Sequence, residues 1–227
     1  LWNAGVTLGF LGILAGNASG LEGLQMPGKV LPLLFFGFAL VGLSLVQTNN
    51  RRTDEEMSPA QWFLFAATLW LPWVLGGSYL LIHFFHAKGV VANIVDWWFI
   101  QNFAKVYLTF VGLGTLFHFL SALSGRQLVG RGHAQLAFWL LLLFGSVGGV
   151  SPGAPVPAWL PALSTVTAVF YFFGVIAAWV SLTRTISGAS AADDADSLAY
   201  NLMRLAALVF ISISVVNVFF AFPGPGS

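Results

Sequence analysis

The chain has 227 residues, of which 58% are apolar, 15% aromatic and only 7% charged. A soluble domain carries roughly 25% charged residues, so this composition excludes a soluble globular protein and predicts a surface that faces lipid. The net charge of +1 excludes the basic field typical of nucleic-acid binding, and the absence of cysteine excludes disulfides, thiolate metal sites and covalent attachment of a c-type haem.

Seven apolar stretches, each of about 20 residues, predict seven transmembrane helices. Lipid cannot hydrogen-bond free backbone groups, and the stretches are continuous rather than alternating, which favours an all-α helix bundle over a barrel. The predicted spans are residues 1–18, 30–47, 61–85, 96–123, 134–150, 163–183 and 198–222. We expect residues 1–227 to form a single transmembrane domain of a longer chain, since the first residue is already apolar and is not methionine.

The short connections carry the signals for helix starts and for orientation. Ser58 precedes Pro59 just before the third span, a pattern typical of an N-cap. The small, acidic segment 184–197 predicts a solvated loop. One side of the membrane collects five arginines and the other side Lys29 and Lys88, which predicts that the first side is cytoplasmic, with the N-terminal end inside and the C-terminal end outside. The arginines are Arg51, Arg52, Arg126, Arg131 and Arg184.

Lys105 is the most informative ionisable residue that the predicted helices place at membrane depth. It lies about 13 Å along the fourth helix from Asp96, too far inside for easy snorkelling to the surface. Helical spacing places Gln101 on the same face, with Trp97 and Trp98 near it. Two interpretations stay open: Lys105 bonds to carbonyl groups of a neighbouring helix, or it contacts a cofactor propionate or a proton path.

The remaining ionisable residues predict surface roles. His83 and His86 are three residues apart, a spacing that suits a metal ion, but no third ligand lies nearby in the sequence, which favours two surface histidines. His118 is expected at the inner interface and His133 in a solvated basic loop. Arg204 lies about two turns inside the last span, where snorkelling is the default.

Several short stretches carry a resemblance to a known family. Asp96-Trp97-Trp98-Phe99 followed by Gln101-Asn102 is similar to that family's Trp-Trp-Tyr-Gly-His-Asn stretch, and Ser124-Gly125-Arg126 to its Gly-Arg turn. Further similar stretches are LWNAG at 1–5, QWF at 61–63, FW at 138–139 and PAW at 157–159. The chain thus resembles the middle part of subunit I of the haem–copper oxidases, most closely the cbb-type cytochrome c oxidases and the related nitric oxide reductases. The resemblance covers nearly the whole chain and is strongest over 90–159.

The resemblance places the copper-binding histidines of the family where this chain has other residues. One histidine corresponds to Gln101, and two consecutive histidines correspond to about Gly149 and Val150; the family's redox-active tyrosine falls near Leu143. Copper requires imidazole donors, so the resemblance implies that the copper site is lost. The predicted topology places this vestigial site in the outer third of the membrane, where Lys105, one turn below Gln101, would supply positive charge in place of copper.

The implied function is that of a degenerate subunit in a respiratory electron-transfer complex of a bacterial inner membrane. Its implied partners are the lipid bilayer, other membrane subunits and c-type cytochrome subunits, and its role is structural or haem-housing. Haem would be held by histidines outside this sequence. Trp97, Trp98, Gln101 and Lys105 would form walls of a haem pocket or a vestigial metal pocket, and no catalytic or metal-binding residue is assigned.

Two other interpretations stay open. The chain is an active cbb-type oxidase or nitric oxide reductase whose ligands fall at other positions; a copper equivalent and oxygen uptake by the purified complex would favour this interpretation. Alternatively it is an unrelated transporter or assembly subunit. Transporter sites use broken helices near the midplane, and Pro72 with Gly76 and Gly77 predicts a break in the third span, although no second repeat shows a matching break.

Overall fold

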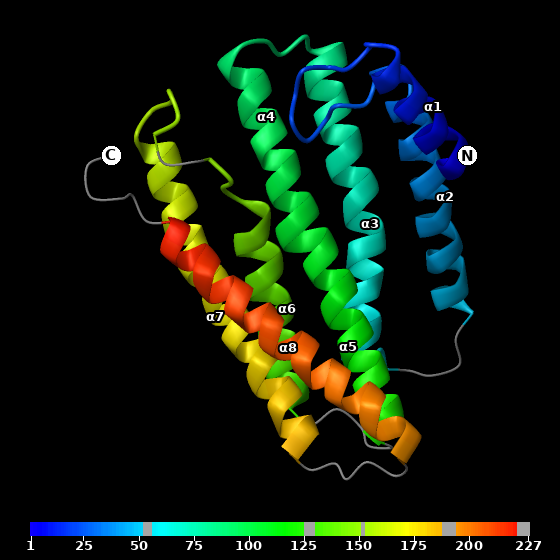
Figure 1. The fold of residues 1–227 in the computed structure, drawn as a ribbon, viewed down its shortest axis with the longest axis vertical. Coiled ribbons are helices and arrows are strands. Elements are labelled where there is room, and N and C mark those ends of the chain that lie inside the picture. The colour runs from blue at the N-terminus through cyan, green and yellow to red at the C-terminus, as the bar shows by residue number, and fades with distance from the viewer. Residues whose placement is uncertain (52–55, 125–129, 151–152, 188–193, 222–227) are drawn as a thin grey trace.

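The structure is a computed structural model that describes residues 1–51, 56–124, 130–150, 153–187 and 194–221. These ranges are almost entirely helical and contain no strand (Figure 1). The predicted all-α class is therefore confirmed. The elements in chain order are α1 (Trp2–Leu14), α2 (Leu31–Asn50), α3 (Pro59–Tyr79), η1 (Leu80–Phe84), α4 (Val90–Gln101), η2 (Asn102–Leu108), α5 (Thr109–Ser124), α6 (Arg131–Ser146), α7 (Trp159–Ser187) and α8 (Asp194–Ala221), where η marks a π-helical turn.

Five helical segments are long and apolar enough to cross a bilayer, so the chain is a multi-pass membrane protein. They are Leu31–Asn50, Pro59–Phe84, Val90–Ala122, Trp159–Thr185 and Ser197–Phe220. The first and fifth predicted spans correspond to α1, which has 13 residues, and α6, which has 16. At 1.5 Å per residue these helices are about 20 and 24 Å long, shorter than a hydrocarbon core of about 30 Å. The predicted count of seven spans is therefore not confirmed.

Two predicted boundaries are wrong at the place where the candidate site lies. The fourth helix begins at Val90 rather than at Asp96. The six residues before Asp96 are mostly apolar and continue the helix back to Gly89, which is its N-cap. The fifth helix ends at Ser146, four residues earlier than predicted. It stops because Val147 is extended and the two glycines after it have positive φ angles of 108° and 93°. Gly149 and Val150 therefore lie in the segment that follows α6 and not on the helix.

Helix α3 confirms one prediction and overturns another. The Ser58 hydroxyl accepts a hydrogen bond from the Gln61 backbone N–H, and the Gln61 side chain bonds back to the Ser58 backbone, which makes a capping box ahead of Pro59. The predicted break at Pro72 is absent, since α3 continues through this residue to Tyr79. A single missing hydrogen bond is tolerated because ending the helix in lipid would expose several more. The broken third helix, which was the main sequence feature that favoured a transporter, is therefore not present.

The helices lie roughly in chain order from α1 and α2 at one edge to α7 at the other, and α8 crosses them diagonally (Figure 1). The main core lies between α3, α5, α6 and α7 and is built from aromatic rings and small residues. Phe63 packs edge-on against Phe110 and Phe138, with ring centroids 4.9 and 5.4 Å apart. Close packing of this kind holds membrane helices together, because lipid is as apolar as the side chains.

Large apolar side chains cover the outside of the bundle. They include Phe36 and Leu40 on α2 and Leu205, Ile213 and Phe219 on α8. Only 11% of the spanning window of α8 is buried, against 39% for α7, so most of α8 faces lipid. This distribution matches a bilayer as the solvent.

Candidate functional site

Gln101 and Gly149 lie against each other, although they are far apart in the chain. Gln101 is the last residue of α4 and is 9% exposed. A Cβ atom built on Gly149 would lie 2.7 Å from the Gln101 Cβ and 2.9 Å from the Trp97 carbonyl oxygen. Two of the three positions aligned with copper ligands are therefore in contact in the structure. The contact is too tight for a side chain at residue 149.

The other two positions aligned with the family's site residues do not reach this contact. Val150 is buried, and its backbone N–H donates to the Ser164 hydroxyl of α7 at 3.1 Å. Leu143, where the family has its tyrosine, is 55% exposed on α6, whereas Leu141 and Gly145 on the same helix are buried. The expected tyrosine position therefore lies on the outside of the bundle.

Trp98, Gly148 and Val150, which neighbour the residues of this contact in the chain, line a cavity of about 370 Å³. The cavity lies between α4, the segment after α6 and the start of α7, and its walls include Trp98, Val147, Gly148, Val150, Trp159 and Leu163. Its walls carry no charged side chain. Such a space accepts apolar groups and gives no charged or imidazole group to an ion.

Asn102 forms the polar centre of the contact between α3, η2 and α6. It is 0% exposed. Its amide nitrogen donates to the carbonyl oxygens of Trp98 at 2.8 Å and Ser146 at 3.1 Å, and its amide oxygen accepts from the Trp70 indole at 2.9 Å. The Trp98 indole donates to the same Ser146 oxygen at 3.2 Å. This network satisfies the C-terminal carbonyl of α6, which lipid would leave unpaired.

Lys105 lies in the π-helical turn η2, which begins at Asn102, directly after Gln101. Its ammonium stands 5.7 Å from the centroid of the Tyr171 ring on α7, a cation–π geometry. The Tyr171 hydroxyl donates to the Lys105 carbonyl oxygen at 3.1 Å, and the Thr109 hydroxyl donates to that of Ala104 at 3.2 Å. Side-chain hydroxyls thus support the widened turn, a local irregularity that often marks a functional site.

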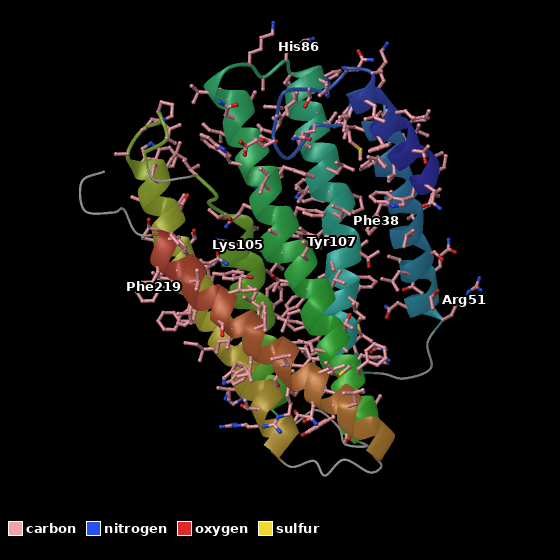
Figure 2. All side chains as sticks on the ribbon, in the orientation of Figure 1. Phe38, Arg51, His86, Lys105, Tyr107 and Phe219 are labelled. Carbon is pink, nitrogen blue, oxygen red and sulfur yellow. The ribbon has the colours of Figure 1, made fainter. Side chains whose placement is uncertain are left out.

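The Lys105 side chain points toward Tyr171 of α7, and its place beside Gln101 and Gly149 stays a prediction. Figure 2 shows Lys105 on the α6 side of its helix and Tyr107 on the opposite side, and the Tyr107 ring contacts Phe38 of α2. A Cβ atom built on Gly145 of α6 would lie 3.3 Å from the Lys105 carbonyl oxygen. Lys105 is half-buried and lies on the side of its helix that meets α6 and α7.

Asp96 holds the connection between α1 and α2 instead of lining the site. Its carboxylate is 3% exposed and accepts the Gly23 N–H at 3.0 and 3.2 Å and the Leu24 N–H at 3.1 Å. These bonds place Leu24 against Leu34 and Phe99 in a second apolar cluster. Asp96 therefore has a structural role, because it ties the connection between α1 and α2 to the middle of α4.

Replacing Asp96 by alanine is expected to loosen this connection. Two buried N–H groups would lose their acceptor, which costs roughly 1–3 kcal/mol. Amide hydrogen exchange should show faster exchange at Gly23 and Leu24, with protection retained in the middle of α5. The control is Glu22→Ala, which removes an exposed acid from the same connection. Unchanged exchange in Asp96→Ala would show that the carboxylate does not hold the loop.

The histidines of the described ranges do not converge. His83 lies in η1 against the Tyr79 ring, with centroids 4.9 Å apart, and His86 follows η1 with a left-handed φ of 54°. The three-residue spacing would place both histidines on one helix face, but His86 lies outside the helix and the two residues therefore do not share a face. His118 is exposed on α5, and His133 is half-buried in the first turn of α6. Within these ranges no three residues among His, Cys, Asp and Glu come together as a metal site.

The other predicted features are placed as follows. Arg204 is exposed on α8, as snorkelling requires. The Gly125–Arg126 turn, Arg52 and Asp193 lie outside the described residues. Sequence reasoning gave no role to Asn102, Trp70 or Tyr171, because it looked for ionisable residues and for positions aligned with the family's ligands. The available signal was a neutral polar residue, Asn102, within an apolar helix, since lipid forces such a group to find a partner.

Comparisons with known proteins do not assign the chain. No protein-family model matches it, and no curated protein matches it significantly. The resemblance to the oxidases therefore depends on the residues and on the contacts described above.

Proposed function

We propose that the chain is a subunit I-like membrane protein of the haem–copper oxidase type that lacks the copper site. Its role is that of a structural or haem-housing subunit in a respiratory electron-transfer complex. The observation that carries the proposal is the contact of Gln101 with Gly149. The resemblance aligned these residues independently with two copper ligands, and their contact between α4 and the segment after α6 supports that alignment.

The residues at the aligned positions do not fit a copper ion. Copper binds imidazole nitrogen in such sites, whereas Gln101 offers an amide, Gly149 a hydrogen and Val150 an isopropyl group. The space is closed as well, because the Gln101 side chain and the Trp97 carbonyl stand where a side chain on residue 149 would be. No catalytic step through copper is therefore derived.

The haem-housing part of the proposal depends on four side chains, those of Trp97, Trp98, Gln101 and Lys105. The two indoles present flat apolar area, and the Lys105 ammonium is a cation within the bundle that can pair with a propionate. Their role as pocket walls stays a prediction. The proposed partners are other membrane subunits and c-type cytochrome subunits, and the proposed location is the bacterial inner membrane.

Metal analysis of the purified complex tests the proposal. The protein is extracted with its partners in mild detergent, and copper and iron per chain are measured together with the optical spectrum and the consumption of oxygen and nitric oxide. We expect copper far below one equivalent and no consumption above the detergent blank. A stoichiometric amount of copper with reductase activity would contradict the proposal and favour an active enzyme.

A histidine variant is the matched control for this measurement. Gln101→His introduces one imidazole where the family has a ligand, and the closed contact at Gly149 leaves it without a second. Copper added to this variant should wash out as readily as from the wild type. Retention of copper by Gln101→His and not by the wild type would show that the site is open and has lost a single ligand.

A further inference from the structure

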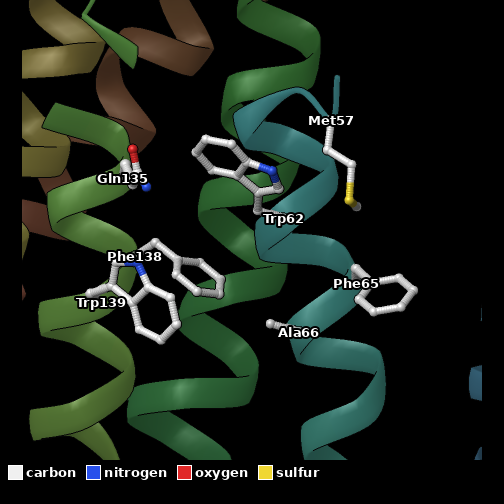
Figure 3. Close-up of a pocket in the computed structure, with 7 residues that line it drawn as sticks. All are labelled: Met57, Trp62, Phe65, Ala66, Gln135, Phe138 and Trp139. Atoms are coloured by element: carbon white, nitrogen blue, oxygen red, sulfur yellow. The ribbon is translucent and has the colours of Figure 1, made fainter. Parts of the chain in front are cut away.

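A second cavity lies at the opposite end of α6 from Gly149. It has a volume of about 360 Å³ and opens between the first turns of α3 and α6 (Figure 3). Its walls include Trp62 and Ala66 on α3 and Phe138 and Trp139 on α6. These residues lie about 5–12 Å along the helices from their first residues, within the first three turns.

The wall of this groove is amphipathic. Aromatic rings from both helices form the floor and sides, and Trp139 is 51% exposed toward the outside of the bundle. Gln135, an exposed amide, stands nearer to the start of α6 than the rings do (Figure 3). A space with this change from apolar to polar fits a molecule with an apolar tail and a polar head. Tryptophan is itself amphipathic in this way and is enriched at membrane interfaces.

A positive and a negative group stand together at the mouth of the groove. The Arg131 guanidinium lies 5.2 Å from the centroid of the Trp62 ring, pairs with the Glu56 carboxylate and donates to the Met57 carbonyl oxygen at 3.3 Å. The side chains of Arg131 and Glu56 are 47% and 73% exposed, so both remain accessible to a ligand. Arg131 and Glu56 are paired with each other, but a guanidinium has five N–H donors and a carboxylate accepts several hydrogen bonds, so the pair beside the groove can still bind a ligand with both charges.

We propose that this groove binds an ethanolamine phospholipid. The phosphate pairs with Arg131, the primary ammonium donates to Glu56, and one acyl chain lies on the aromatic wall. A headgroup with phosphate and no ammonium competes with Glu56 for Arg131 and gives the carboxylate no new donor. A choline headgroup has no N–H to donate to the carboxylate. The two charges of the mouth thus match the two charges of this headgroup.

Lipid retention tests this assignment on the protein purified with its partners. Nanodiscs hold equal amounts of phosphatidylethanolamine, phosphatidylglycerol and phosphatidylcholine with identical acyl chains, and native mass spectrometry counts the lipids retained after transfer to detergent. We expect the wild type to retain the ethanolamine lipid roughly fivefold over the other two. Glu56→Gln and Arg131→Gln should each remove roughly that factor, the upper range for one exposed ion pair.

Two further variants separate the groove from its surroundings. Ala66→Phe fills the groove and should abolish retention, whereas Leu69→Phe places the same ring on the lipid-facing side of α3. Arg51→Gln removes an exposed arginine at the end of α2 and should leave retention unchanged. Equal retention of the three lipids by the wild type would overturn the proposal. A preference for phosphatidylglycerol that Glu56→Gln strengthens would also overturn it and assign the groove to an anionic lipid.

Discussion

Gly149→Ala is expected to lower the free energy of unfolding by about 3 kcal/mol. The new methyl group would lie 2.7 Å from the Gln101 Cβ and 2.9 Å from the Trp97 carbonyl, and neither atom belongs to a flexible side-chain end. The φ angle of 93° adds strain for any residue with a Cβ atom. Unfolding of the detergent-solubilised protein by a denaturing detergent, followed by tryptophan fluorescence, measures the loss.

Gly153→Ala separates the two causes. Gly153 has a similar φ of 85°, but a Cβ atom built on it meets nothing within 4 Å. This variant should lose about 1–2 kcal/mol, the cost of the left-handed backbone without a clash. The difference between the two variants measures the contact with Gln101 and Trp97. Equal losses would show that residue 149 has room for a side chain, which would remove the steric part of the argument against copper.

Asn102→Leu is expected to lower the free energy of unfolding by about 2 kcal/mol. Leucine has a similar volume but leaves the Trp70 indole N–H without its acceptor inside the bundle. An unpaired buried polar group costs roughly 1–3 kcal/mol, and hydrogen bonds between membrane helices have reached about 1.7 kcal/mol. The same unfolding measurement applies, and the emission of Trp70 and Trp98 should shift in the folded state.

A double-mutant cycle with Trp70→Phe checks the cause. Phenylalanine removes the indole N–H, so the double variant should lose less stability than the sum of the two single variants. Asn93→Leu, which changes an exposed asparagine of α4, is the matched control and should stay within about 0.5 kcal/mol of the wild type. Additive losses in the cycle would contradict the hydrogen bond between Asn102 and Trp70.

Both predictions concern the part of the molecule where sequence reasoning was least complete. The resemblance selected Gln101 and Gly149, and the structure brings them together, but it places Leu143 outside the bundle. Asn102 stood in the same stretch as Gln101 and was not given a role. Its importance follows from three partners that lie on α3, on its own helix and at the end of α6.

The sequence by itself determined the all-α class, the membrane as solvent, the order of the helices and the N-cap at Ser58. These features are local, because a long apolar run in lipid has few ways to satisfy its backbone other than a helix. The tertiary structure decided where α6 ends, where the π-helical turn lies and which polar groups pair. Those outcomes depend on contacts between residues 32 to 66 positions apart, such as Trp70 with Asn102 and Tyr171 with Lys105, and no local pattern encodes such contacts.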